Sequence, residues 1–306
     1  IDYRETAPSA AHRDMYLDEQ GQVIENKSIY GIHASGVPGS VAGMWLAYKK
    51  HGTLPWKALV QPAVILAEQG FVVPEKLAQL IEDYIAHLNN KNINVNFASY
   101  FATATAGALF KQPELAATLK RIRDEGQDGF YQGETAAIIA KFMHQHGGII
   151  NQDDLKRYRA KSRTPIKANW NGYQVLTSPP PSSGGIAILQ WLKMYELKKP
   201  TPAQQHNSVG YVHLLAEIGK RVFADRAEYL GDPDFTNIKI NNFLSKEYLK
   251  QIAFKISLNK KIESKKKELF NENSIMLIGE FGGITLNDYF TNNFNKFNES
   301  QNIKLL

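Results

Sequence analysis

Hydrophobic positions recur at helical spacing along most of the first 230 residues. Apolar side chains fall at intervals of three and four within segments that open on a proline or a small polar residue and close on glycine. In the first of these, Thr53 is predicted to cap the helix and Gly70 to stop it. The pattern predicts helices over residues 54–69, 74–88, 113–125, 134–146, 185–197 and 208–229, with a short one starting at Asn151.

One stretch changes to a shorter period. Within residues 164–179, two short runs with β-type alternation flank the pair Asn171–Gly172. Asn-Gly is a strong signal for a tight two-residue turn, because both residues adopt positive φ readily. The sequence therefore predicts a β-hairpin inside an otherwise helical region.

The composition shifts after Phe235. Residues 236–306 hold 12 Asn, 11 Lys and 7 acidic residues but no Arg, and their apolar residues follow no steady period. We therefore predict two domains, 1–235 and 236–306, and less order in the second. The lysines supply most of the net charge of +6, yet "KKIESKKKELF" has no interleaved aromatics. It is typical of a solvated helix face, so no nucleic-acid partner is expected.

Several classes of chemistry are excluded or disfavoured. The chain has no cysteine, no phosphate-binding glycine motif and no apolar run of 18 residues. We therefore expect no disulfide, no nucleotide cofactor or other cofactor, and no membrane span. No signal peptide is visible from Ile1 onward. His144 and His146 lie two apart and face different sides of a helix, so no metal is expected there.

Two stretches carry candidate chemistry. "PPPSSGG" places Ser182 and Ser183 either as nucleophiles or as caps of the following helix, and without a G-x-S-x-G pattern the cap is favoured. In "IDYRETAP", the planar guanidinium of Arg4 suits bidentate binding of a carboxylate. The alternative for Arg4 is a structural role, paired with Glu5 or Asp14.

Taken in order, a set of blocks resembles the large subunit of the γ-glutamyltransferase (glutathione hydrolase) family. The resemblance covers residues 1 to about 250 and rests on "IDYRETAP", "GVPGSVAGMWLAYKKHGTLPW", "QPAVILAEQGFVV", "GFYQGETAAIIA", "RTPI", "GYQV", "PPPSSGGI" and "FADRAEYLGDPDF". It implies an α+β fold, the αββα sandwich of N-terminal-nucleophile hydrolases, truncated here and richer in helix. It also implies a periplasmic or secreted protein.

The resemblance assigns roles to the candidate residues. The family transfers a γ-glutamyl group from glutathione to water, amino acids or peptides through an acyl-enzyme. Its nucleophile is the N-terminal threonine of a small subunit, whose own α-amino group can act as base. Ser182 and Ser183 are then structural. Arg4 matches the arginine that grips the α-carboxylate of the γ-glutamyl group, and Glu5 matches the acid beside it.

The chain departs from the family pattern where the small subunit would lie. The family's small subunit opens with Thr-Thr-His, whereas this chain has no Thr-Thr pair and its last histidine is His213. Near the end, "GEFGGITLNDYFTNNF" resembles a small-subunit run and would put Asn293 in place of the acid that binds the amino group. We therefore expect no catalytic residue, no turnover by this chain alone, and weak binding of glutathione at best. Two alternatives remain: a non-catalytic scaffold or interaction protein, and one part of a complex whose second chain supplies the nucleophile.

Overall fold

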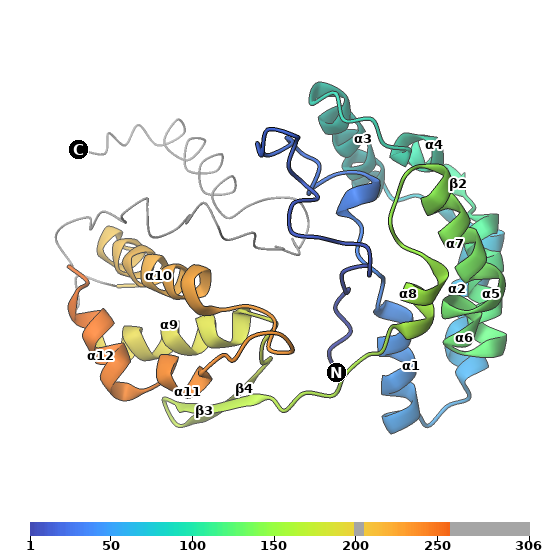
Figure 1. Cartoon of the computed structure of the whole chain (residues 1–306). Coiled ribbons are helices and arrows are strands. Elements are labelled where there is room, and N and C mark those ends of the chain that lie inside the picture. The colour runs from blue at the N-terminus through green and yellow to red at the C-terminus, as the bar shows by residue number, and fades with distance from the viewer. Residues whose placement is uncertain (199–204, 258–306) are drawn as a thin grey trace. The chain divides into compact units, whose positions relative to one another are not determined.

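The computed structural model describes residues 1–198 and 205–257, which belong to two compact units, 1–162 and 163 onward (Figure 1). The first unit contains η1 (Ile32–Ala34), α1 (Ser40–His51), α2 (Trp56–Gln69), β1 (Phe71–Val72), α3 (Glu75–Asn90), α4 (Phe97–Phe101), β2 (Leu109–Phe110), α5 (Pro113–Glu125), α6 (Asp128–Tyr131), α7 (Gly133–Gln145) and α8 (Gln152–Arg157). The second contains β3 (Ile166–Trp170), β4 (Tyr173–Thr177), α9 (Gly184–Lys198), α10 (Val209–Tyr229), α11 (Ile240–Phe243) and α12 (Lys246–Phe254).

Each helix predicted from the hydrophobic pattern is present within a few residues of its expected bounds. The start of α2 differs most from the prediction. It begins at Trp56, and the residue before it is Pro55 in an extended conformation (φ −58°, ψ 135°), so Thr53 lies too far upstream to cap it. The predicted end is correct, because the α2 C-cap residue, Gly70, adopts the positive φ of 87° that other residues rarely reach.

The predicted hairpin is confirmed. Strands β3 and β4 are antiparallel, with Trp170 opposite Tyr173 at the turn and Ile166 opposite Thr177 at the open end. Asn171 (φ 47°) and Gly172 (φ 81°) both adopt the left-handed conformation that a two-residue turn of this hand requires.

In the first unit, α2, α5, α6 and α7 pack in succession, and α8 packs on α6 and α7. The main core lies where α1, α5, α6, α7 and α8 converge. Its buried members are Val37, Val41, Ala42, Ile122, Tyr131, Ala136, Met143, Ile150, Leu155 and Tyr158. Tyr131 and Tyr158 are the polar-tipped members of this core, so their hydroxyls must find partners inside it.

The second unit is built on α9 and α10, which lie side by side (Figure 1), with α12 packed on α9. Leu249 and Ala253 of α12 are buried in the same cluster as Met194 of α9 and Ile218 of α10. The prediction of low order after Phe235 was therefore wrong for Ile240–Phe254. The few apolar residues there fall at helical spacing, and Ser245 caps α12 by accepting from the Tyr248 amide at 3.3 Å. Residues 258–306 lie outside the described part, and the division at residue 235 stays a prediction.

The two glycines of "PPPSSGG" have different surroundings, which gives a controlled prediction. A Cβ on Gly185 would lie 2.0 Å from the Ser178 carbonyl oxygen, whereas one on Gly184 would lie 3.6 Å from the Ser182 hydroxyl. Gly185→Ala should therefore lower the free energy of unfolding by about 1–3 kcal/mol through overpacking against backbone. Gly184→Ala should be close to neutral. Denaturant unfolding of both variants checks this, and equal effects would contradict it.

Candidate functional site

The first residues form an extended segment, the N-terminal strap (residues 2–9), which the first unit holds at several points. Asp2 and Lys161 exchange two backbone hydrogen bonds of 2.7 Å. Further along, the Thr6 amide donates to the Val37 carbonyl at 3.2 Å, and the Val37 amide donates to the Thr6 carbonyl at 2.8 Å. Arg4 lies midway between these two backbone pairings, so both sides of it are anchored.

The backbone of Arg4 has anchors of its own. The Tyr158 hydroxyl donates to the Arg4 carbonyl oxygen at 2.7 Å, and the Arg4 amide donates to Asp2 Oδ1 at 3.1 Å. The side chains of Arg4 and Glu5 are exposed. The backbone of Arg4 is thus fixed while its side chain is exposed at the surface. These anchors hold Arg4 in place although it is only the fourth residue of the sequence.

Asp154 holds the far end of the strap. Its carboxylate accepts from the Ser9 amide at 3.0 Å and from the Asn151 amide at 3.2 Å, and its own amide donates back to the Asn151 side chain at 2.9 Å. The last two bonds form a capping box at the start of α8. The side chain is 4% exposed and also pairs with Arg157. One buried carboxylate therefore starts α8 and anchors the strap.

Two buried tyrosines support the same region. The rings of Tyr131 and Tyr158 stack with centroids 5.6 Å apart and planes 7° from parallel. Burial raises the pKa of Tyr131 to about 12, and burial likewise raises the pKa of Tyr158, with further increases from Tyr131 and the carboxylates of Asp2 and Glu5. Both hydroxyls therefore stay protonated near neutral pH and act as donors.

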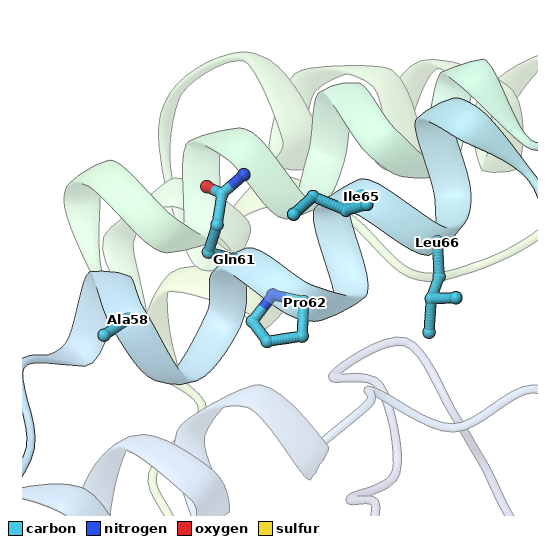
Figure 2. A pocket seen from close by; sticks show the side chains of 5 residues that line it. All are labelled: Ala58, Gln61, Pro62, Ile65 and Leu66. Atoms are coloured by element: carbon cyan, nitrogen blue, oxygen red, sulfur yellow. The ribbon is translucent and has the colours of Figure 1, made fainter.

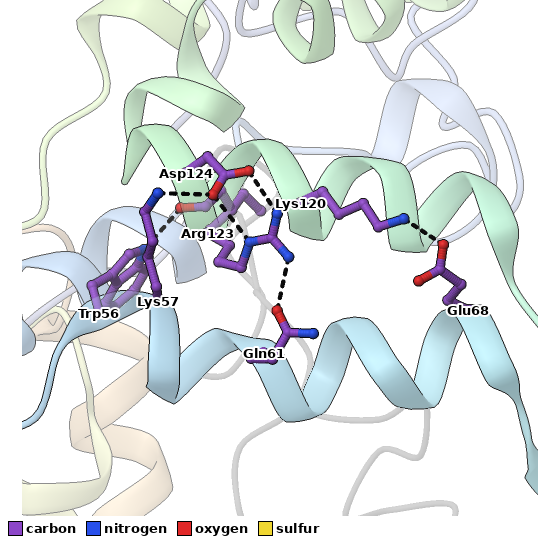
Figure 3. A network of polar contacts seen from close by, with 8 residues as sticks. Trp56, Lys57, Gln61, Glu68, Lys120, Arg123 and Asp124 are labelled. Atoms are coloured by element: carbon purple, nitrogen blue, oxygen red, sulfur yellow. Dashed lines mark hydrogen bonds and ion pairs between the residues drawn. The ribbon is translucent and has the colours of Figure 1, made fainter.

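Ion pairs between α2 and α5 are structural rather than catalytic (Figure 3). The Arg123 guanidinium holds the pKa of Asp124 at about 2, with Lys57 adding to the effect at 3.2 Å. Arg123 also donates to the Gln61 side chain at 2.8 Å, and Trp56 donates to the Ile122 carbonyl at 2.8 Å. These contacts join two packed helices.

Ser183 and the acidic residues of "GDPDF" have structural partners. Ser183 accepts from the Arg226 side chain at 2.9 Å. Asp234 forms a two-bonded pair with Arg163 at 2.8 and 3.2 Å, and Asp232 Oδ1 accepts from the Asp234 amide in a local turn. The Arg163–Asp234 pair therefore joins the block "RTPI" to "GDPDF". The bond from Arg226 to Ser183 joins "FADRAEYL" to "PPPSSGG". Asn293 lies outside the described residues.

Two shallow apolar grooves are present in the described chain. The first runs along α2 (Figure 2), and the second lies beside the hairpin. No ionisable side chain lines the α2 groove. Its single polar side chain, Gln61, already accepts a hydrogen bond from Arg123. The second is lined by Trp170, Ile188, Trp191, Leu192, Tyr195, Tyr211 and Leu215. Neither groove is lined by a nucleophile beside a base.

Residues 1–198 and 205–257 contain no cluster of three or more His, Asp or Glu able to hold a metal ion. Over the same ranges, no helix has both the length and the apolar character needed to cross a bilayer.

Comparison with known proteins decides the family. The sequence model of gamma-glutamyltranspeptidase matches residues 1–280. The chain belongs to the γ-glutamyltranspeptidase family. It is 47% identical over 258 residues to the glutathione hydrolase proenzyme of Pseudomonas aeruginosa, covering 84% of this chain and 46% of that protein. It therefore spans about half the length of the curated relatives it matches.

Solved structures of γ-glutamyltranspeptidases share the fold. The enzyme from Pseudomonas nitroreducens, solved in complex with L-DON, superposes with a TM-score of 0.80 at 45% identity, over 86% of this chain and 78% of that one. The Helicobacter pylori enzyme gives 0.78 at 36% identity, over 85% and 74%. The α+β fold of the family's N-terminal-nucleophile hydrolases, helix-rich in this chain, is thus confirmed.

Sequence reasoning found the γ-glutamyltranspeptidase block around Arg4 but missed what holds it. Asp154 did leave a signal, because Asn151 followed three residues later by an acid fits a capping box. Nothing in the sequence around Tyr158 indicates its contact with Arg4, which lies 154 residues away.

Proposed function

We propose that this chain carries the carboxylate-binding part of a γ-glutamyl site, with Arg4 as the binding group and Glu5 beside it. One observation carries the proposal: an exposed arginine stands on a strap whose backbone is fixed at Arg4 and on both sides of it. Curated relatives that the chain matches are glutathione hydrolase proenzymes, which supports glutathione and other γ-glutamyl compounds as the ligand class.

The chemistry fits this assignment. A guanidinium binds a carboxylate through two parallel N–H···O bonds, and such charge-assisted pairs are among the stronger polar contacts. Glu5 can help to orient that fork, and its stem packs closely on Gly36, where an added Cβ would lie 2.8 Å from Glu5 Cγ. Because the Glu5 stem lies against the backbone of Gly36, the positions open to the Glu5 carboxylate are limited.

We further propose that these 306 residues bind without turning over. Transfer requires a nucleophile that attacks the γ-carbonyl carbon, releases the amine of the donor and forms an acyl-enzyme, together with a base that takes the nucleophile's proton. The sequence lacks the Thr-Thr-His with which the family's small subunit begins. A second chain supplying that threonine is the alternative, since the relatives extend well beyond the matched half.

The test is incubation of the purified chain with a chromogenic γ-glutamyl anilide, followed by denaturing gel analysis. We expect no release of the anilide above a heat-denatured control and no self-cleavage. Turnover by the chain alone, or a discrete split at Thr236, Thr285 or Thr291, would contradict the proposal. Turnover only after addition of a family small subunit, lost again in Arg4→Lys, would favour the two-chain alternative.

A further inference from the structure

We propose that Tyr158 is a positioning residue for Arg4: its buried hydroxyl, by holding the Arg4 carbonyl, sets where the guanidinium stands. This rests on the proposed function, because it explains how the binding group is placed. The contact joins the strap to the C-terminal end of α8, where Tyr158 is the C-cap residue.

The position of the contact along the strap supports this role. The backbone pairings at Asp2 and Thr6 each lie two residues from Arg4. They fix the direction of the strap, whereas the 2.7 Å bond from Tyr158 acts on the Arg4 peptide itself. Because the guanidinium lies at the end of a long side chain, a small shift of its backbone displaces and tilts the fork.

Tyr158 is itself held rigidly. It is 6% exposed, and its ring stacks on Tyr131 in the main core of the first unit. Gly39 closes off the other direction, because a Cβ there would lie 2.0 Å from both the Tyr158 hydroxyl and the Tyr3 carbonyl oxygen. The strap, the tyrosine and the start of α1 therefore meet too closely for the hydroxyl to move far.

The neighbouring tyrosine offers a matched control. Tyr131 is 4% exposed, but its hydroxyl donates to the Pro38 carbonyl at 2.7 Å and accepts from the Ala42 amide at 3.3 Å, with no bond to Arg4. Both Tyr158→Phe and Tyr131→Phe keep the ring stack and remove one buried hydroxyl. If Tyr158 has only a structural role, the two substitutions should have similar effects on both stability and glutamate affinity. If Tyr158 positions Arg4, only Tyr158→Phe should weaken glutamate binding.

The experiment follows the Arg4 Nε–Hε signal by NMR during titration with glutamate, the signal being assigned from its loss in Arg4→Lys. In the wild type we expect a saturable shift. In Tyr158→Phe the dissociation constant should rise about tenfold or more, whereas Tyr131→Phe should stay within about threefold. Thermal unfolding of both variants confirms that they fold. Wild-type affinity in Tyr158→Phe would overturn the inference.

Failure of the proposed function gives a different result. If glutamate leaves the wild-type signal unmoved, Arg4 is not the carboxylate site, but positioning can still be judged from the free proteins. A shifted or broadened Arg4 Nε–Hε signal in Tyr158→Phe, unchanged in Tyr131→Phe, would support the role of Tyr158. An identical signal in all three proteins would overturn it.

Discussion

Asp154→Ala should lower the free energy of unfolding of the first unit by about 2–4 kcal/mol, because it removes one half of the α8 capping box and takes a charged acceptor from two amide donors. The Ser9 and Asn151 amides both depend on this carboxylate. We also expect faster amide exchange at Ser9, since the far end of the strap is released. Denaturant unfolding and hydrogen exchange measure the two effects.

The neighbouring Asp153 is the matched control. It lies in the same first turn of α8 but is exposed, so Asp153→Ala should change stability by about 0.5 kcal/mol or less. Equal losses in the two variants would show that the acids act only through the helix dipole and that Asp154 does not anchor the strap.

The same carboxylate predicts a pH dependence. Burial alone would raise the pKa of Asp154, but hydrogen bonds from Ser9, Asn151 and Arg157 outweigh it and hold the pKa below its usual value. A depressed pKa adds stability above the unfolded value of about 3.9, and this is lost as pH falls through the folded value. The stability difference between wild type and Asp154→Asn should therefore be constant near neutral pH and shrink below about pH 4.

Asp225→Ala should destabilise the second unit by a similar amount, about 2–4 kcal/mol. Its carboxylate accepts from the Tyr248 hydroxyl at 2.6 Å and from the Gln190 side chain at 2.7 Å, and so joins α10 to α12 and α9. Burial, followed by the Asp225 carboxylate, raises the pKa of Tyr248, which keeps this hydroxyl a donor. Removing the acid takes the acceptor from the half-buried Tyr248 hydroxyl and leaves the buried Gln190 amide only its bond to the Phe243 carbonyl.

Glu228 serves as the control for this change. It lies one turn further along α10 and is exposed, so Glu228→Ala should have little effect on the denaturant midpoint. Tyr248→Phe should cost less than Asp225→Ala, because the acid keeps its bond from Gln190. If Asp225→Ala unfolds at the wild-type midpoint, the network does not hold α12 against α9.

Local chemistry explains which elements could be predicted. Proline and glycine mark the ends of α2, α3 and α5, and the Asn171–Gly172 pair fixes the β3–β4 turn through its two positive φ angles. The order of α12 was missed because its asparagine- and lysine-rich surroundings hide three buried positions, Leu249, Ala253 and Ile256. The composition of a segment is an average over many residues, whereas the packing of α12 depends on these few apolar positions.

The candidate site was predictable only in part, for a related reason. The arginine in "IDYRETAP" could be found because its block is contiguous. Its supports could not, since Asp154 and Tyr158 lie 145 and 154 residues from their strap partners. Similarly, Ser183 looked like a possible nucleophile, but it contacts Arg226 of another block and holds the fold together.

Calorimetric titration of glutamate into the wild type and Arg4→Lys tests the central claim, that Arg4 binds the γ-glutamyl carboxylate. We expect a millimolar dissociation constant for the wild type, about −4 kcal/mol. Arg4→Lys should weaken binding about tenfold or more, because an ammonium cannot reproduce the planar fork. Arg13→Lys, at a 68% exposed arginine of the same unit, should bind like the wild type. Micromolar binding of glutamate that Arg4→Lys leaves unchanged would contradict the account.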